Sequence, residues 1–154
     1  MDVTLKLANE NDAELLWRMQ VESFRKTYET YRDDETSPHL EPPERTKMRI
    51  REPITSYYLI LADGQPVGGI RIRDCGAEDP KVLGPLYVLP DLRGKGIAQK
   101  AIKLVEEIHG SENWLLDTIL QEAGNCHLYE KMGYRRIGIS QIVNERMTLV
   151  LYKK

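Results

Sequence analysis

The stretch from Leu83 to Glu107, LGPLYVLPDLRGKGIAQKAIKLVEE, restricts the possible folds more than any other part of this chain. It begins with the composition of a strand, continues through a short loop with Gly94 and Gly96, and ends as an amphipathic helix. Because proline cannot donate a hydrogen bond to a neighbouring strand, Gly84-Pro85 predicts a break in strand pairing. We therefore expect a sheet with one interrupted strand, followed directly by a glycine loop and a helix.

The interrupted strand and the loop together predict a site for an anion attached to an amide-rich arm. Backbone groups of Leu86, Tyr87 and Val88 would lack a partner strand and could pair with an extended, amide-containing ligand. At the loop, the first N–H groups of the helix and its dipole favour an anion, and Arg93 and Lys95 add positive charge. The glycines alone fit an ordinary turn equally well, but the charges and the broken strand favour anion binding.

Two other phosphate-binding motifs do not fit the spacing. The pattern of a Walker loop, Gly, four residues, then Gly-Lys-Ser/Thr, does not occur in the sequence. A dinucleotide fingerprint requires Gly or Ala where Gln99 stands, and a second strand where this chain continues as a helix to His109.

The hydrophobic pattern along the chain predicts a single domain over residues 1–154. We expect strands and helices in the order β-α-α-β-β-β-α-β-α-β-β, with a hairpin around Asp63-Gly64 and a turn at residues 77–81. Antiparallel hairpins mixed with helical crossovers predict the α/β class: a single mixed, largely antiparallel sheet with a splayed central strand pair and helices on both faces.

Composition argues against several kinds of partner. Hydrophobic residues make up 41%, charged residues 30%, and the net charge is −2, so neither disorder nor binding to nucleic acid is indicated. No export signal and no long apolar segment is seen, and we expect a cytoplasmic protein without membrane association. Cys75 and Cys126 read as free thiols, and the spacing of His39, His109 and His127 indicates no metal site.

The run Arg93-Gly94-Lys95-Gly96-Ile97-Ala98 resembles the signature of the GNAT superfamily of acetyl-coenzyme A-dependent N-acetyltransferases, which is Arg or Gln, two residues, Gly, one residue, then Gly or Ala. The preceding LYVLPDL and the order of elements are also similar, so the resemblance covers nearly the whole chain. In that family the loop holds the coenzyme A pyrophosphate, and the splayed strand pairs with pantetheine and polarises the thioester carbonyl. The resemblance implies acetyl-coenzyme A as co-substrate, with the following backbone positions at the coenzyme: Leu86, Tyr87, Val88, Arg93, Gly94, Lys95, Gly96, Ile97 and Ala98.

A second match, LYEKMGY, is similar to a family segment whose tyrosine commonly protonates the departing thiolate. The resemblance assigns this role to Tyr129, and a phenol of pKa about 10 can donate to a thiolate whose conjugate thiol has a pKa near 8.5. Without the motif, Tyr129 would read as a core residue. An asparagine often stands seven residues before this tyrosine, where the chain has Glu122. Asn125 is instead expected to cap the helix.

Direct attack by an amine needs a general base, because an amine with a pKa near 10 is protonated at neutral pH. Asp117 and Glu122 are the preferred candidates, since ligands of such sheets collect at the C-terminal ends of strands, and Glu22 is a third. Each also fits a structural or solvated charge. Cys126 lacks a base partner, so no covalent enzyme intermediate is expected.

The sequence predicts a small-molecule or peptide amine as acceptor without identifying it. The acidic segment 29–44 could attract a cationic amine, or could be a solvated loop, and the basic stretch 45–51 has the opposite sign. Trp17, Phe24, Tyr28 and Tyr31 could line an acceptor pocket. The sequence leaves open whether the chain forms a homodimer. The alternatives to an enzyme are a noncatalytic acyl-coenzyme A sensor and a generic nucleotide-binding module.

Overall fold

The computed structural model describes residues 1–76 and 78–154, so the turn predicted at residues 77–81 includes one residue, Ala77, outside the described part. The strands and helices follow each other in the predicted order. They are β1 (Val3–Leu7), α1 (Ala13–Tyr31), α2 (Pro43–Arg51), β2 (Thr55–Ala62), β3 (Gln65–Arg73), β4 (Lys81–Val88), α3 (Ile97–His109), β5 (Trp114–Ile119), α4 (Ala123–Lys131), β6 (Arg135–Ile142) and β7 (Thr148–Lys153).

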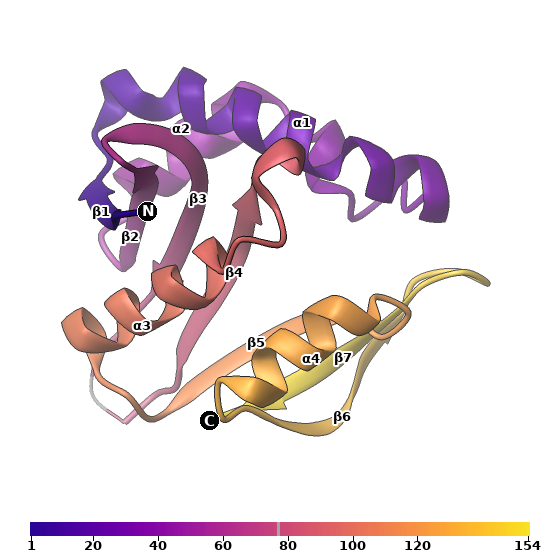
Figure 1. The fold of residues 1–154 in the computed structure, drawn as a ribbon. Coiled ribbons are helices and arrows are strands. Elements are labelled where there is room, and N and C mark those ends of the chain that lie inside the picture. The colour runs from indigo at the N-terminus through magenta and orange to yellow at the C-terminus, as the bar shows by residue number, and fades with distance from the viewer. Residues whose placement is uncertain (77) are drawn as a thin grey trace.

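The strands form one seven-stranded mixed sheet in the order β1-β2-β3-β4-β5-β7-β6. Every neighbouring pair is antiparallel except β4 and β5, which are parallel and joined through α3. The predicted fold class is therefore confirmed. Figure 1 shows α1 and α2 on one side of the first half of the sheet, and α3 and α4 on the opposite side.

Alternation along β2 explains how one strand serves two cores. Successive side chains of a strand point to opposite faces. Tyr57 and Leu59 pack in a cluster with Leu16 of α1. Tyr58 and Ile60 belong to the larger cluster, which includes the buried faces of α3 and α4. Burial on both faces fixes the register of this strand, since a slip by one residue would exchange the two sets.

The central strands β4 and β5 separate after a short paired segment. They pair only at Lys81 with Trp114 and at Val82 with Leu115, within the part of the chain that the structure describes. Beyond that point the strands diverge, as Figure 1 shows, while residues 86–88 remain paired with β3. The Gly84-Pro85 bond, which is cis, lies where the pairing stops. The splay predicted from these two residues is confirmed, and it opens the sheet at its centre.

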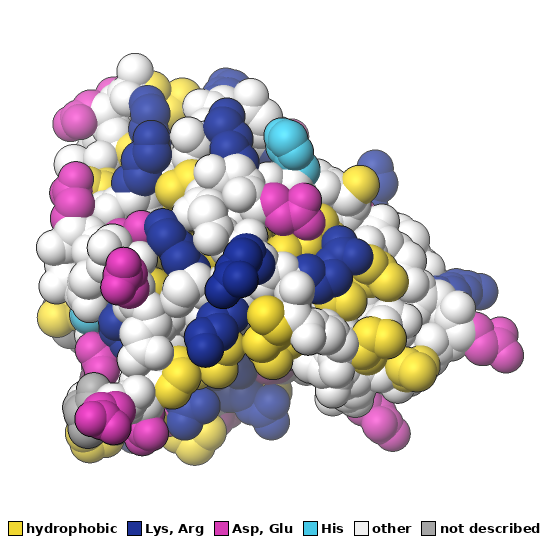
Figure 2. Space-filling model, turned by 90° about the horizontal axis from the view of Figure 1, so that it is seen from below, with side chains coloured by type: hydrophobic (Ala, Val, Ile, Leu, Met, Phe, Trp, Pro, Cys, Tyr) yellow, Lys and Arg dark blue, Asp and Glu magenta, His cyan; other side chains and the backbone are white. Residues whose placement is uncertain are grey.

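The surface mixes both signs of charge with apolar side chains. Figure 2 shows the molecule from below, with Lys and Arg side chains set among apolar ones and Asp and Glu more toward the edges. The edge strand β6 is exposed along its length, including Ile137, Ile139 and Ile142. None of the helices among the described residues combines the length and apolar character needed to cross a bilayer.

Candidate active site

Two cavities meet where β4 and β5 separate. The first, here called the loop cavity, has a volume of about 480 Å³ and is bounded by residues 86–88, the loop at 92–99 and the start of α4. The second, called the strand cavity, measures about 330 Å³ and lies among β3, β4, β5, β7 and the segment after α1. Both are lined by Phe24, Thr27, Leu86, Asn125 and Tyr129. A ligand in one cavity can therefore meet a ligand in the other at this junction.

The loop cavity carries a set of backbone donors suited to an anion. Gly94 and Gly96 have φ angles of 77° and 79°, in the left-handed region that favours glycine, and their Cα positions face open space. Among the described residues, the N–H groups of residues 94–99 donate to no backbone carbonyl, and the last of them open helix α3. These amides and the positive end of the helix dipole can cradle a pyrophosphate.

The sequence suggested that the charge of Arg93 adds to the anion site, and in the structure its guanidinium contacts two backbone carbonyls. Its Nε donates to the Val88 carbonyl at 3.0 Å, and its Nη2 donates to the Ser23 carbonyl of α1. The guanidinium thus ties the loop to α1 and β4, and Arg93 also lines the loop cavity. Lys95 remains exposed.

The open edge of β4 is provided by alternate residues. The Leu89 N–H donates to the Val67 carbonyl of β3 at 2.9 Å, so by alternation Tyr87 also turns its backbone toward β3. Leu86 and Val88 then face the gap left by β5, where the Val88 carbonyl already accepts from Arg93. Of the backbone groups predicted to pair with a ligand, those of Leu86 and the N–H of Val88 are therefore the ones that face the gap without a partner strand. The Tyr87 side chain is buried under α1, where its hydroxyl donates to the Leu16 carbonyl at 3.0 Å.

Tyr129 lies on the buried face of α4 and lines both cavities. Its ring packs edge-on to Tyr134, with ring centroids 5.9 Å apart. Burial, and then the nearby carboxylate of Asp117, raise the pKa of the Tyr129 phenol, so the hydroxyl keeps its proton at neutral pH. A protonated phenol at the junction can donate a proton to a leaving group there.

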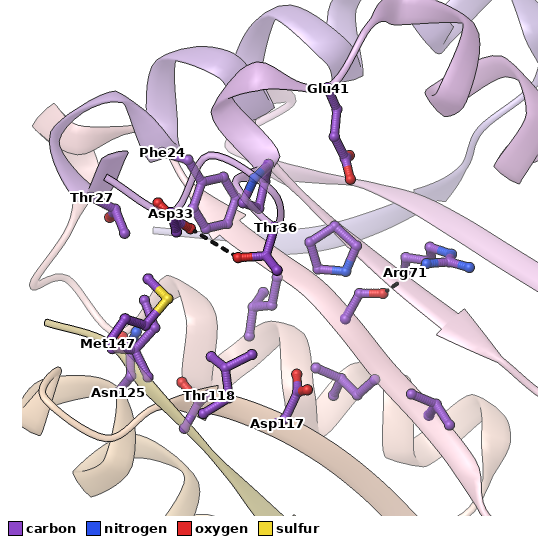
Figure 3. Close-up of a pocket in the computed structure, with 18 of the residues that line it drawn as sticks. Phe24, Thr27, Asp33, Thr36, Glu41, Arg71, Asp117, Thr118, Asn125 and Met147 are labelled. Carbon is purple, nitrogen blue, oxygen red and sulfur yellow. Dashed lines mark hydrogen bonds between the residues drawn. The ribbon is translucent and has the colours of Figure 1, made fainter. Parts of the chain in front are cut away.

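Asp117 projects from β5 into the strand cavity (Figure 3). Its carboxylate is open to the cavity and accepts a long hydrogen bond of 3.5 Å from Ser140. The surrounding cleft displaces enough water to raise the pKa of this carboxyl. Asp117 is thus a carboxylate of raised pKa in the wall of the strand cavity.

The other two candidate bases lie elsewhere. Glu122 stands at the N-terminal capping position of α4, makes no capping hydrogen bond with its side chain, and lines the loop cavity. Its charge is the second cause, after burial, of a raised pKa at Tyr31. Glu22 is exposed and pairs with Arg25 at 2.7 Å, outside both cavities. Of the three acids, Asp117 is the one in the strand cavity.

The expected capping role of Asn125 is wrong. Helix α4 begins at Ala123 with Glu122 at the capping position, so Asn125 lies in its first turn. The helix starts earlier than predicted because Gly124, which sequence rules place in a turn, is accommodated within it. Asn125 instead lines the junction of the two cavities.

The segment after α1 folds back over the strand cavity instead of forming a solvated loop. Asp33, Thr36, Pro38 and Glu41 line this cavity. Of the four aromatic residues considered for a pocket, Phe24 is the one that lines it, and Trp17 donates from its indole to the Glu41 carbonyl at 2.8 Å.

Sequence reasoning did not single out Arg71 or Asp33. Arg71 lies on β3 between Ile70 and Ile72, both fully buried on the opposite face. The sequence did contain a signal for Arg71, which is a charged residue between two apolar residues of a strand that is buried on both faces. Asp33 gave no such signal, since it lies in an acidic, irregular segment.

Comparisons with known proteins show which family and which solved structures this chain is similar to. A model of the "Acetyltransferase (GNAT) family" matches residues 16–134. A comparison with curated protein sequences finds no significant match.

Several solved structures share the fold. An acetyltransferase from Thermus thermophilus is 18% identical with a TM-score of 0.75, covering 99% of this chain and 96% of that one. A spermidine N-acetyltransferase from Vibrio cholerae, in complex with CoA and spermine, is 16% identical with a TM-score of 0.76, covering 97% and 93%. PaiA N-acetyltransferase from Thermoplasma acidophilum, in complex with coenzyme A, is 18% identical with a TM-score of 0.69, covering 100% of both chains.

Proposed function

The chain belongs to the GNAT acetyltransferase family, and from this premise we propose that it transfers the acetyl group of acetyl-coenzyme A to a primary amine by direct attack in a ternary complex. Family membership makes it an acetyltransferase with acetyl-coenzyme A as co-substrate. The kind of acceptor, the order of events and the role of each residue are our proposal. The observation that carries it is the meeting of two cavities at Tyr129 and Leu86.

In this proposal the loop cavity holds the coenzyme. The amides of residues 94–99 bind the pyrophosphate, and the open edge at Leu86 and Val88 pairs with the pantetheine arm and polarises the thioester carbonyl. This arrangement would deliver the thioester to the junction, next to the Tyr129 hydroxyl. Arg93 acts as a positioning residue, because its bonds to α1 and β4 hold the loop against the strand.

The strand cavity holds the amine. Asp117 takes a proton from the ammonium, directly or through a water, and the neutral nitrogen attacks the thioester carbon. The C–N bond forms, the C–S bond breaks, and the sulfur leaves as a thiolate that receives the Tyr129 proton. The nitrogen of the new amide then loses its second proton, which returns to the Tyr129 phenolate directly or through water. The raised pKa of Asp117 makes its carboxylate more basic. The negative charge of Asp117 contributes to the raised pKa of Tyr129, so uptake of the ammonium proton by Asp117 makes the phenol a better proton donor.

The test combines binding with kinetics. Calorimetric titration should give selective binding of acetyl-coenzyme A over ATP and NAD, and a panel of amines should then drive release of free thiol. Initial rates at varied concentrations of both substrates should give intersecting double-reciprocal lines, as a ternary complex requires. Binding without amine-dependent thiol release would favour the sensor alternative, and parallel lines would indicate a covalent enzyme intermediate.

A further inference from the structure

Arg71 is a charged side chain in the wall of the strand cavity that the proposed transfer does not use. It extends from β3, and its Nη1 donates to the Gly84 carbonyl at 3.4 Å (Figure 3). Its Nε is buried and has no hydrogen-bond partner among the residues that the structure describes. A partly buried guanidinium with a buried, unused donor is unfavourable unless a partner meets it.

The neighbouring acids do not supply that partner. Glu41 is engaged by Arg49 in a two-pronged pair at 2.8 and 3.0 Å, and Glu52 pairs with Arg73 at 3.4 Å. Burial, and then the positive charges of Arg49 and Arg73, lower the pKa of Arg71 to about 10. The guanidinium remains charged at neutral pH, and its two acidic neighbours are each engaged by another arginine.

Asp33 lies on the opposite side of the same cavity (Figure 3). The residue is 3% exposed, and one carboxylate oxygen lies 3.5 Å from the Thr36 hydroxyl. The other oxygen is buried without a hydrogen-bond partner in the described part of the chain. Asp33 lies across the cavity from Arg71, and Asp117 lines the same cavity, so acidic groups and a guanidinium share its wall.

We propose that the acceptor is amino-acid-like: its carboxylate pairs with Arg71, and its reacting amine lies near Asp117. Guanidinium and carboxylate match in shape and can form two parallel hydrogen bonds. A basic amino acid would also place its second ammonium group at Asp33. The cavity volume of about 330 Å³ lies at the lower end of small-ligand sites, which span roughly 300–1,000 Å³. The inference rests on the proposed function and narrows its acceptor class.

Pairs of amines that differ by one carboxylate test this directly. Thiol release is measured for L-lysine and cadaverine, L-ornithine and putrescine, and for further α-amino acids beside their decarboxylated amines. We expect kcat/KM at least 10-fold higher for the carboxylate member of the preferred pair. Equal or better use of the decarboxylated amines overturns the inference. Failure with every free amino acid also overturns it, while use of spermidine or of a peptide with an amidated C-terminus in that case leaves the proposed function intact.

Variants of Arg71 test whether its guanidinium is the group that recognises the acceptor carboxylate. Arg71→Met should raise KM for the carboxylate acceptor at least 10-fold and leave KM for acetyl-coenzyme A unchanged. The acceptor KM of Arg71→Lys should lie between those of the wild type and Arg71→Met, since an ammonium keeps the charge but cannot form two parallel hydrogen bonds with a carboxylate. The matched control is Arg73→Met on the same strand, because Arg73 is more exposed and does not line the cavity. If Arg71→Met lowers the use of amines with and without a carboxylate equally, Arg71 is structural and the inference fails.

Discussion

The two cavities that meet at Tyr129 are built in different ways. The loop cavity takes its proposed ligand-binding groups from one continuous stretch, residues 86–99, and these groups are backbone amides that any sequence possesses. The strand cavity is formed by side chains from β3, β5, β7 and the segment after α1, which lie far apart in the sequence. The first depends on glycines that permit a conformation, while the second depends on which charges the fold happens to bring together. Variants confined to one cavity can separate the two.

Tyr129→Phe should produce the largest effect and should act at the junction alone. Loss of the hydroxyl removes the proposed proton donor, and we expect kcat to fall by about 10²-fold. The acetyl-coenzyme A dissociation constant should stay nearly unchanged, because the ring remains in place. Steady-state kinetics and calorimetry measure the two quantities.

Tyr134→Phe is the matched control for this variant. Its ring packs on Tyr129 and its hydroxyl is also buried, but it lies in neither cavity. Activity should therefore remain close to that of the wild type. Full activity in Tyr129→Phe, or an equal loss in both variants, would remove Tyr129 from the mechanism.

Asp117→Asn tests the strand side of the comparison and should lower kcat by about 30-fold at neutral pH. Because burial raises the pKa of Asp117, its carboxyl takes up a proton at higher pH than an ordinary aspartate. The wild-type rate should therefore fall as pH decreases through that raised pKa. The variant should lose this acidic limb, which a pH profile of kcat/KM would record.

Glu122→Gln serves as the comparison for the base, since Glu122 lies on the loop side. We expect it to keep the acidic limb. Should Glu122→Gln abolish the limb while Asp117→Asn preserves it, the base belongs to the loop cavity, and the division of roles between the cavities is wrong.

Gly96→Val tests the loop side and should weaken acetyl-coenzyme A binding by about 10-fold, because a branched residue resists positive φ and crowds the phosphate. Gly64→Val is the matched control. Gly64 has a φ of 81° and open space around it, but lies in the β2–β3 hairpin away from both cavities. Both variants should lose stability in thermal melts, and only Gly96→Val should lose affinity. Equal affinity in the two would count against the loop as the phosphate site.

This difference in construction also explains what the sequence could predict. The order of elements, the splay at Gly84-Pro85 and the family signature follow from local patterns, and the structure and family match confirm them. The positions of individual side chains could not be predicted from such local patterns. The position of the Arg93 guanidinium depends on carbonyls that the fold brings close, including one on α1. Arg71 and Asp33 face each other across a cavity only because β3 and the segment after α1 meet in space, and no local pattern records that meeting.

The smallest expected effect concerns the hairpin that closes the strand cavity. Asn144, between β6 and β7, donates from Nδ2 to the Tyr31 carbonyl at the end of α1 at 2.9 Å. Its Oδ1 accepts from the N–H groups of Arg146 and Met147, and Met147 lines the cavity. Asn144→Asp keeps this acceptor and removes the donor, so it loosens the hairpin from α1, which Arg146 still contacts through the Thr30 carbonyl at 3.3 Å, without dissolving the turn. The lost bond is worth about 1 kcal/mol, and we expect acceptor KM to rise by about threefold.

The same variant should leave acetyl-coenzyme A binding unchanged, because the loop cavity contains no residue of this hairpin. Asn144→Ala, which loses both the donor and the turn acceptor, should show a larger KM for the acceptor and a lower melting temperature. If Asn144→Asp instead weakened the coenzyme and left the acceptor unaffected, the hairpin would support the loop cavity. The division between a backbone-built and a side-chain-built cavity would then be wrong at this hairpin, whose Met147 lines the strand cavity.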